Sequence, residues 1–281
     1  MNKLIDSKGI TEEEFLKSYD PGEFDRLSLS VDVVVFSIDS EKQIDNYRKL
    51  DEEKLTILLV KRNEHPFMKK WSLPGGFVGM NETLEDTAKR ILSNKLRMKD
   101  LYLEQLYTFG SLNRDPRMRI ISCSYLSLID RSKYKIETSD SISEYSWFEI
   151  ELLEEEKVLK LSNENEAIEI PIVKTLEQNG KIKNVKYSIL EDRILAFDHG
   201  SIILEGLLRL RRKIEYTDIV FNLLPEKFSI TQLQKIFEII LGQKLLAAAF
   251  RRKIASKITE TGEYSREKGH RPSQFFVFRK E

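Results

Sequence analysis

The residues best suited to hold a charged ligand surround a glycine turn in the first half of the chain. The run Trp71-Ser72-Leu73-Pro74-Gly75-Gly76-Phe77-Val78 places two glycines after a proline. Arg62 precedes this turn, and the later loop 113–119 contains Arg114 and Arg119. Guanidinium groups pair bidentately with phosphate oxygens, so these arginines could hold a diphosphate, with Arg119 the first choice. A solvated β-turn is the other interpretation of the loop. Trp71 could stack on a base, although tryptophan lies more commonly in a core.

A helix is predicted to follow the glycine turn, over residues 83–96. Apolar residues recur there at helical spacing, and Thr83 with Asp86 three residues later resembles a capping box. Gly76, Glu82 and Arg90 fit the first half of the Nudix signature, G-x5-E-x7-R-E-U-x-E-E-x-G-U. The first domain therefore resembles the Nudix family. That resemblance implies an α/β/α sandwich and Mg²⁺-dependent hydrolysis of nucleoside diphosphates linked to another group.

The second half of the signature, which carries the metal ligands in the family, is altered. Three carboxylates spaced i, i+3 and i+4 share one helical face and hold Mg²⁺ through hard oxygen ligands. This sequence has Ile91, Asn94 and Lys95 at those positions. Glu82 and Glu85 remain, and we expect them to cap the helix and offset its dipole. The sequence therefore predicts no catalytic residue, no metal site and no cofactor. Mg²⁺ would be required only if the domain were an active hydrolase.

The charge of the chain is unevenly placed, although 46 Lys and Arg residues balance 46 Asp and Glu residues. Residues 201–281 hold 16 Lys and Arg against 9 Asp and Glu, an excess of seven positive charges. The first 200 residues carry the opposite excess. A basic segment often binds an anionic polymer such as nucleic acid, and it can also be only a solvated surface.

The apolar period of the same basic segment predicts three short helices followed by a strand, a turn and a strand. This order is typical of a winged helix-turn-helix, whose third helix enters the major groove of DNA. That helix is predicted over residues 245–257, with Leu246, Phe250, Ile254 and Ile258 facing the core. The opposite side and the wing supply the predicted DNA contacts, which are Lys244, Arg251, Arg252, Lys253, Lys257, Lys268, His270 and Arg271. A basic helical bundle that binds protein is the alternative.

Segments of both halves resemble the Nudix-related transcriptional regulators. They are Leu195–Gly200, Leu223–Phe228, Phe250–Lys253 and Gly269–Pro272 in the second half, and Leu103–Gly110 and Arg114–Arg117 in the first. The resemblance implies a homodimer that represses transcription by binding a double-stranded DNA operator. It also implies that a non-hydrolytic Nudix domain senses a nucleotide sugar or a sugar, such as ADP-ribose. The residues predicted to bind this effector are Arg62, Trp71, Gly75, Gly76, Phe77, Glu82, Arg114 and Arg119. His199 is expected to link the two domains by a hydrogen bond.

The chain is predicted to be α+β, with a Nudix α/β/α sandwich followed by a winged helix-turn-helix domain. Strand-length apolar runs dominate the first part of the chain, and the apolar period becomes helical from Phe197. We expect an N-terminal extension at 1–26, a Nudix-like effector domain at 27–192 and a DNA-binding domain at 193–281. Asn179-Gly180 predicts a type I′ turn in a hairpin at about 167–189, inserted in the Nudix-like domain.

Composition excludes several classes of protein. The chain has 281 residues, of which 41% are hydrophobic and 33% charged, as in a soluble globular protein. No apolar stretch approaches the length of a membrane span, and the acidic start does not match a secretory signal. Cys123 is the only cysteine, which favours a reducing cytoplasm. Two other functions stay open: an active Nudix hydrolase of ADP-ribose or a similar diphosphate, and a non-catalytic module that binds RNA or protein.

Overall fold

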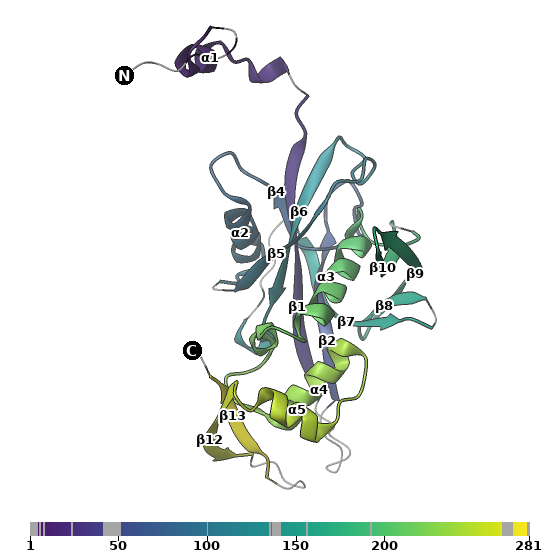
Figure 1. The fold of residues 1–281 in the computed structure, drawn as a ribbon. Coiled ribbons are helices and arrows are strands. Elements are labelled where there is room, and N and C mark those ends of the chain that lie inside the picture. Colours follow the sequence, from purple (N-terminus) through teal and green to yellow (C-terminus); the bar gives the residue numbers. More distant parts are fainter. Residues whose placement is uncertain are drawn as a thin grey trace.

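A mixed ten-stranded sheet forms the centre of the molecule (Figure 1), with the strand order β10-β9-β8-β7-β2-β1-β6-β5. The computed structural model describes residues 5, 7, 9–23, 25–41, 52–99, 101–134, 136, 142–155, 157–191, 193–265 and 272–279. The strands are β1 (Ser28–Glu41), β2 (Glu52–Arg62), β3 (Trp71–Ser72), β4 (Gly75–Phe77), β5 (Tyr102–Phe109), β6 (Ile120–Leu128), β7 (Ile142–Leu153), β8 (Val158–Ser162), β9 (Ala167–Asn179) and β10 (Ile182–Ile189). The short strands β3 and β4 pair with β2 and β1, and β1 and β6 run parallel.

One face of the sheet is covered by α2 (Leu84–Leu96). Alternate residues of β1 point to opposite faces, and Val31, Val33 and Val35 pack towards α2. Thr83 caps this helix and forms the predicted capping box with Asp86. The helix that carries the Nudix signature is therefore confirmed, and its apolar side is held against the sheet.

The opposite face is covered by α3 (His199–Lys213) and α4 (Ile230–Leu241), which lie on the other side of the sheet from α2 (Figure 1). Val34 and Phe36 of β1 belong to this second core. Gly206 of α3 lies so close to β1 that a Cβ at Gly206 would be 3.1 Å from a methyl carbon of Val34. The predicted sandwich of helix, sheet and helix is confirmed, and α3 provides part of its third layer.

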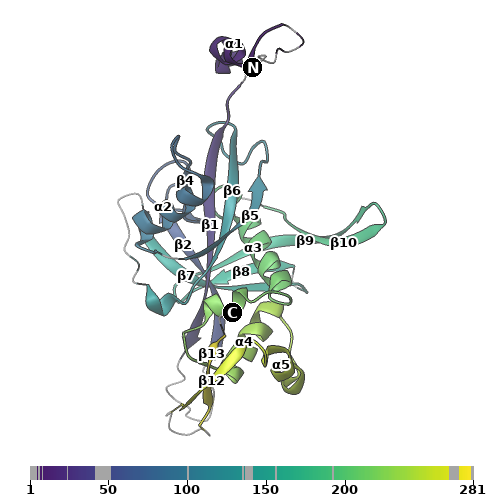
Figure 2. The same ribbon diagram turned by 60° about the vertical axis from the view of Figure 1, so that its left-hand side comes forward.

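A second sheet of three strands lies beside α4 and α5 (Ala247–Ile254), at the end of the molecule opposite the N-terminal helix α1 (Glu12–Ser18) (Figure 2). Its strands are β11 (Phe228–Ser229), β12 (Ile258–Tyr264) and β13 (Gln274–Phe278), in the order β11-β13-β12, and a 3-10 helix, η3 (Ile219–Leu223), precedes them. The winged helix-turn-helix is confirmed. The predicted contacts Lys268, His270 and Arg271 fall in the wing segment 266–271 and lie outside the described residues.

The third helix of this module differs from its prediction. It begins at Ala247 and ends at Ile254, whereas residues 245–257 were expected to be helical. Leu246 is not a core residue: it precedes the helix with an extended backbone, so it falls outside the helical period, and it is 81% exposed. Leu245 packs against the core instead, and Phe250, Ile254 and Ile258 are buried as predicted.

Two segments extend from the body of the molecule. The N-terminal α1 (Glu12–Ser18) and the 3-10 helix η1 (Pro21–Glu23) lie away from the sheet (Figure 1). The hairpin β9–β10 projects as an arm (Figure 2), but Ile182 pairs with Asn179, so Gly180 and Lys181 form its turn. Only Gly180 has a positive φ, 63°, which a type II′ turn requires, so the predicted type I′ turn centred on Asn179-Gly180 is wrong by one position.

A 3-10 helix, η2 (Arg131–Lys133), follows β6. Among the described helices, none is long and apolar enough to cross a membrane.

Candidate functional site

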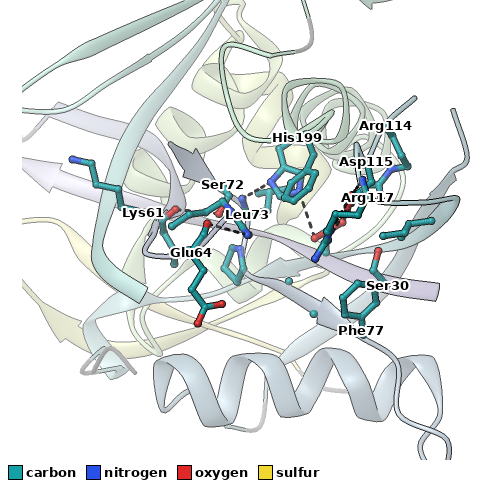
Figure 3. A pocket seen from close by; sticks show the side chains of 18 residues that line it. Ser30, Lys61, Glu64, Ser72, Leu73, Phe77, Arg114, Asp115, Arg117 and His199 are labelled. Atoms are coloured by element: carbon teal, nitrogen blue, oxygen red, sulfur yellow. Dashed lines mark hydrogen bonds and ion pairs between the residues drawn. The ribbon is translucent and has the colours of Figure 1, made fainter. Parts of the chain in front are cut away.

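A cavity of about 230 Å³ opens where the ends of β1, β2 and β4 meet the loop 114–117 and the start of α3 (Figure 3). Pro74 and the two glycines that follow it form one wall. Residues from both predicted domains therefore line this cavity.

A buried ion cluster forms the floor of the cavity. The guanidinium of Arg114 donates from Nε to Asp198 Oδ2 over 3.0 Å and from Nη2 to Asp198 Oδ1 over 2.8 Å. Its Nη2 also lies 3.4 Å from Asp32 Oδ2, which accepts a hydrogen bond from the Ser122 hydroxyl. The charged side chains of this cluster are all less than a tenth exposed. Arg114 thus joins the sheet to Asp198, the residue that precedes α3.

His199 is the first residue of α3 and lies against the same cluster. The backbone N–H of Leu73 donates to His199 Nδ1 over 2.8 Å, and His199 Nε2 is 3.5 Å from Asp32 Oδ1. Burial lowers the pKa of His199 below its ordinary value, although the charge of Asp32 opposes this effect. The imidazole is therefore neutral, with its proton on Nε2 facing Asp32. The predicted hydrogen bond between the two domains is present, and Leu73 is its donor.

The buried ion cluster leaves no room for a side chain at position 75, which is occupied by Gly75. A Cβ at Gly75 would lie 2.1 Å from Asp32 Oδ1 and 3.1 Å from the carbonyl oxygen of Val31. Both distances are shorter than ordinary contacts. The glycine turn allows the Asp32 carboxylate to approach the backbone, and any side chain would displace it.

Two arginines and two phenylalanines form the outer part of the cavity. The Arg62 guanidinium lies 5.0 Å from the ring centroid of Phe197, and that of Arg117 lies 5.2 Å from Phe77 and 5.9 Å from Phe197. Arg117 also pairs with Asp115, at 3.0 and 2.7 Å. Burial, with the nearby Arg117, lowers the pKa of Arg62, which still remains a cation at neutral pH. Cations beside flat rings suit an anionic ligand that carries a flat group.

Arg62 and Arg117 differ in how their positive charges are balanced. Arg62 Nε donates to the carbonyl oxygen of Pro66 over 2.7 Å, and no carboxylate of the described residues lies within ion-pair distance of it. Burial opposes ionisation of Asp115, but hydrogen bonds from the guanidinium and the backbone N–H of Arg117 outweigh it and hold the pKa of the Asp115 carboxyl below its ordinary value. The positive charge of Arg62 is therefore available to a ligand, while that of Arg117 is partly neutralised.

Glu82 holds the loop that precedes α2. It accepts hydrogen bonds from Arg90 Nη2 over 2.6 Å, Arg90 Nε over 2.8 Å and the Gly79 N–H over 2.6 Å. These bonds, first of all those from Arg90, lower the pKa of Glu82 to about 2. Arg90 also donates to the carbonyl oxygen of Phe77, which closes the loop. Glu82 is engaged in positioning this loop.

The altered half of the signature does not fit a magnesium site. Ile91 is fully buried in the core beneath α2, and Asn94 is exposed. Among the described residues, no group of three or more His, Cys, Asp or Glu side chains could hold a metal ion. Mg²⁺ prefers several hard oxygen ligands, and no carboxylate stands at the signature positions 91, 94 and 95.

A basic surface forms the second candidate site. Arg251 and Arg252 of α5 are exposed and make no ion pair with any described carboxylate. Lys253 lies over the ring of Phe237, with Nζ 5.6 Å from its centroid. Of the predicted contacts, Lys244 pairs with Glu238 over 3.2 Å and Lys257 pairs with Asp218. The two arginines are thus the cations of α5 most available to a polyanion.

Comparisons with known proteins cover both sites. Residues 46–168 match the NUDIX domain, and residues 220–278 match the NrtR DNA-binding winged helix domain. Over 271 residues the chain is 31% identical to the ADPR responsive transcriptional repressor NtrR of Acinetobacter baylyi, covering 95% of this chain and 88% of that protein. The chain belongs to the NrtR family of Nudix regulators.

Solved structures agree with this membership of the NrtR family. The crystal structure of a MutT/nudix family protein from Enterococcus faecalis matches with a TM-score of 0.71 and 28% identity, over 96% of this chain and 94% of that one. That of Shewanella oneidensis NrtR complexed with a 27mer DNA matches with a TM-score of 0.58 and 26% identity, over 89% and 93%. A shorter region, 37% of this chain, is 30% identical to an ADP-ribose pyrophosphatase of Methanocaldococcus jannaschii and covers 63% of it.

In this member of the NrtR family, the cavity brings together five of the eight residues predicted to bind an effector. They are Arg62, Gly75, Gly76, Phe77 and Arg114. The other three lie elsewhere. Trp71 is buried in the core and donates from Nε1 to Glu166 over 2.9 Å, Glu82 is held by Arg90, and Arg119 donates to the carbonyl oxygen of Ser111 over 2.9 Å.

Asp32, Arg117 and Phe197 are cavity residues that the sequence did not single out. Asp32 is a carboxylate inside an apolar strand, a pattern that marks a buried charge in need of partners. Arg117 belongs to the same loop as Arg114 and was not distinguished from a solvated arginine. Phe197 has a left-handed backbone, with φ 55°, which is uncommon for a bulky residue. Only the fold brings Phe197 to Arg62.

Proposed function

We propose that this protein is a transcriptional repressor that binds double-stranded DNA through its winged helix and ADP-ribose through its Nudix domain, without hydrolysing it. The observation that carries this proposal is a cavity lined by arginines and phenylalanines, to which the start of α3 contributes one wall. The Nudix helix of the same chain lacks the carboxylates that hold the metal in the signature. We infer ADP-ribose as the effector because the Acinetobacter relative is named as responsive to ADPR. The protein acts as a homodimer in the cytoplasm.

The chemistry of the cavity supports a nucleoside diphosphate as its ligand. The guanidinium of Arg62 is oriented by the carbonyl oxygens of Pro66 and Glu64, and a diphosphate would supply the anionic partner that it lacks among the described residues. Phe77 is 46% exposed and offers a ring on which a base can stack. Because Ile91, Asn94 and Lys95 replace the carboxylates of the Nudix signature, a diphosphate bound here would lack the ligand set that holds Mg²⁺ for Nudix hydrolysis.

The helix α3 offers a physical route from the cavity to the DNA-binding module. Its first residue, His199, contacts the cavity, and Arg211 near its end donates from Nε to the carbonyl oxygen of Ile240 over 2.9 Å. Ile240 lies in the last turn of α4, next to the turn that leads to α5. An effector that favours one position of α3 therefore favours one position of the helix-turn-helix. Regulation requires that ADP-ribose bind the DNA-competent and DNA-incompetent arrangements with different affinities.

The experiment begins with selection of genomic fragments by the purified full-length protein. Fluorescence anisotropy then measures binding of the recovered duplex as ADP-ribose is added, with ADP as the matched control ligand. We expect steep dependence on salt, since each phosphate contact releases a counterion, and release of the duplex by ADP-ribose. Turnover of ADP-ribose with Mg²⁺ at ordinary enzyme rates would contradict the proposal and favour the hydrolase. Equal affinity for random single-stranded RNA would favour an RNA-binding module. Sedimentation equilibrium tests the homodimer.

A further inference from the structure

The turn between α4 and α5 is clamped by two side chains of α4. Glu238 Oε1 accepts a hydrogen bond from the N–H of Leu245 over 2.9 Å, and Gln234 Nε2 donates to the carbonyl oxygen of Leu245 over 3.0 Å. Gln234 also donates to Glu238 over 3.0 Å, so the two side chains support each other. Both backbone groups of Leu245 are therefore fixed, and its side chain packs against the core. The direction of the next residue, Leu246, follows from this clamp.

Leu246 projects outward from the start of α5. It is 81% exposed, and Ala247, Ala248 and Ala249, the first residues of the helix, are exposed as well. A single exposed leucine is ordinary on a protein surface. This one, however, lies at the first turn of the helix expected to enter the major groove, where the leading residues of a recognition helix face the base edges.

The charges around this apolar surface identify the partner that fits it. Arg251 and Arg252 follow one turn later on the same helix, exposed and without a described carboxylate partner. An apolar centre beside unpaired cations complements duplex DNA, whose phosphates flank a groove that displays thymine methyl groups. The three small alanines leave the backbone of α5 free to approach the bases.

We propose that Leu246 contacts the C5 methyl group of a thymine in the major groove and so determines part of the operator sequence. Arg251 and Arg252 hold the neighbouring phosphates and set the depth of the helix. The inference rests on the proposed DNA-binding function and adds to it a base-contacting residue. It assigns the discrimination to an apolar contact, which distinguishes thymine from a base that lacks the methyl group.

The test removes the methyl group from the DNA and the leucine from the protein in turn. Each thymine of the selected duplex is replaced singly by deoxyuridine, and anisotropy measures the affinity of the full-length protein. We expect one position in each half-site of the homodimer at which the wild type binds about fourfold more weakly, the factor that corresponds to burial of one methyl-sized group. L246A should bind the thymine duplex no better than the wild type binds the deoxyuridine duplex, and it should not discriminate between the two.

The matched control is L176A, because Leu176 is 75% exposed on the β9–β10 arm. L176A should keep the full response to deoxyuridine, and both variants should keep the wild-type melting temperature, since neither side chain is buried. The inference is overturned if the wild type binds every deoxyuridine duplex as tightly as the thymine duplex, or if L246A retains the fourfold loss. Failure of the wild type to bind any selected duplex would instead refute the DNA-binding function itself.

Discussion

Replacing Asp198 by asparagine tests the buried ion cluster below the cavity, because the change removes one charge and keeps the shape of the side chain. Asp198 accepts two hydrogen bonds from Arg114, at 3.0 and 2.8 Å. The second carboxylate, Asp32, lies farther from the guanidinium, at 3.4 Å. The D198N variant therefore leaves Arg114 buried, with its weaker partner as the only carboxylate of this cluster.

The expected loss of stability follows from the burial of this cluster. Removal of one partner from a buried ion pair costs about 3–5 kcal/mol, because it leaves an uncompensated charge. Asp32 remains in D198N, so we expect the lower value, about 3 kcal/mol. R114Q should cost at least as much, since it leaves two buried carboxylates without their cation. In the double variant the losses should fall short of additivity by about 2 kcal/mol, because the residues share one network.

The assay is urea unfolding followed by tryptophan fluorescence, with the free energy of unfolding compared at pH 7. The control is K186Q, whose pair with Glu177 spans 2.8 Å but is 55% exposed on both sides. Exposed pairs contribute about 0–1 kcal/mol, so this variant should be nearly neutral. The reasoning is refuted if D198N loses no more stability than K186Q, or if the losses of D198N and R114Q add fully in the double variant.

Four further predictions address the same contacts. G75A should lose about 1–3 kcal/mol in urea unfolding, because its Cβ would lie 2.1 Å from Asp32 Oδ1; an unchanged midpoint would contradict this. His199 has a lowered pKa in the folded state, so its contribution to stability is present above about pH 6.5, the unfolded value, and is lost as the pH falls. H199Q should therefore show a smaller loss of unfolding free energy from pH 7 to pH 5.5 than the wild type, and an equal loss would exclude this role. R251A should reduce the salt slope of duplex binding by about two, about one for each Arg251 of the homodimer, as measured by anisotropy, and an unchanged slope would show that this arginine does not contact phosphate. R211A should bind ADP-ribose normally by calorimetry, yet its duplex affinity should respond less to ADP-ribose; an unchanged response would remove α3 as the route.

The elements that depend on local sequence were predictable. The sequence predicts α2 from the capping box of Thr83 and Asp86 and from the apolar period that follows. The structure has both the box and the helix. The β-branched run that contains Val33 was likewise predictable as β1. Its residues alternate between two buried faces, so the whole run is apolar. Such signals act over a few residues and need no knowledge of the fold.

The cavity depends on contacts between distant parts of the chain, so the sequence predicted only part of it. The hydrogen bond from Leu73 to His199 joins residues 126 positions apart, and the pair of Arg114 and Asp198 spans 84 positions. Arg114 was predicted as a ligand residue because arginine pairs with phosphate, yet its donors are engaged by two carboxylates. Arg114 does pair with anionic groups, but that they are Asp198 and Asp32 could be found only from the fold.

Under the proposed function, α3 is the element that joins effector sensing to DNA binding. The boundary expected at residue 192 separates α3 from the sheet, because the apolar period of a helix does not reveal which surface covers it. In the structure α3 packs on β1, where Gly206 meets Val34, and its first residue lines the cavity. The sheet therefore cannot bury its second face without the helix that also holds α4 through Arg211. We propose that the mechanical boundary lies after α3, where the match to the winged helix domain also begins, at residue 220. A ligand that acts on the cavity then moves an element that belongs to both parts, and no separate linker is needed to carry the signal.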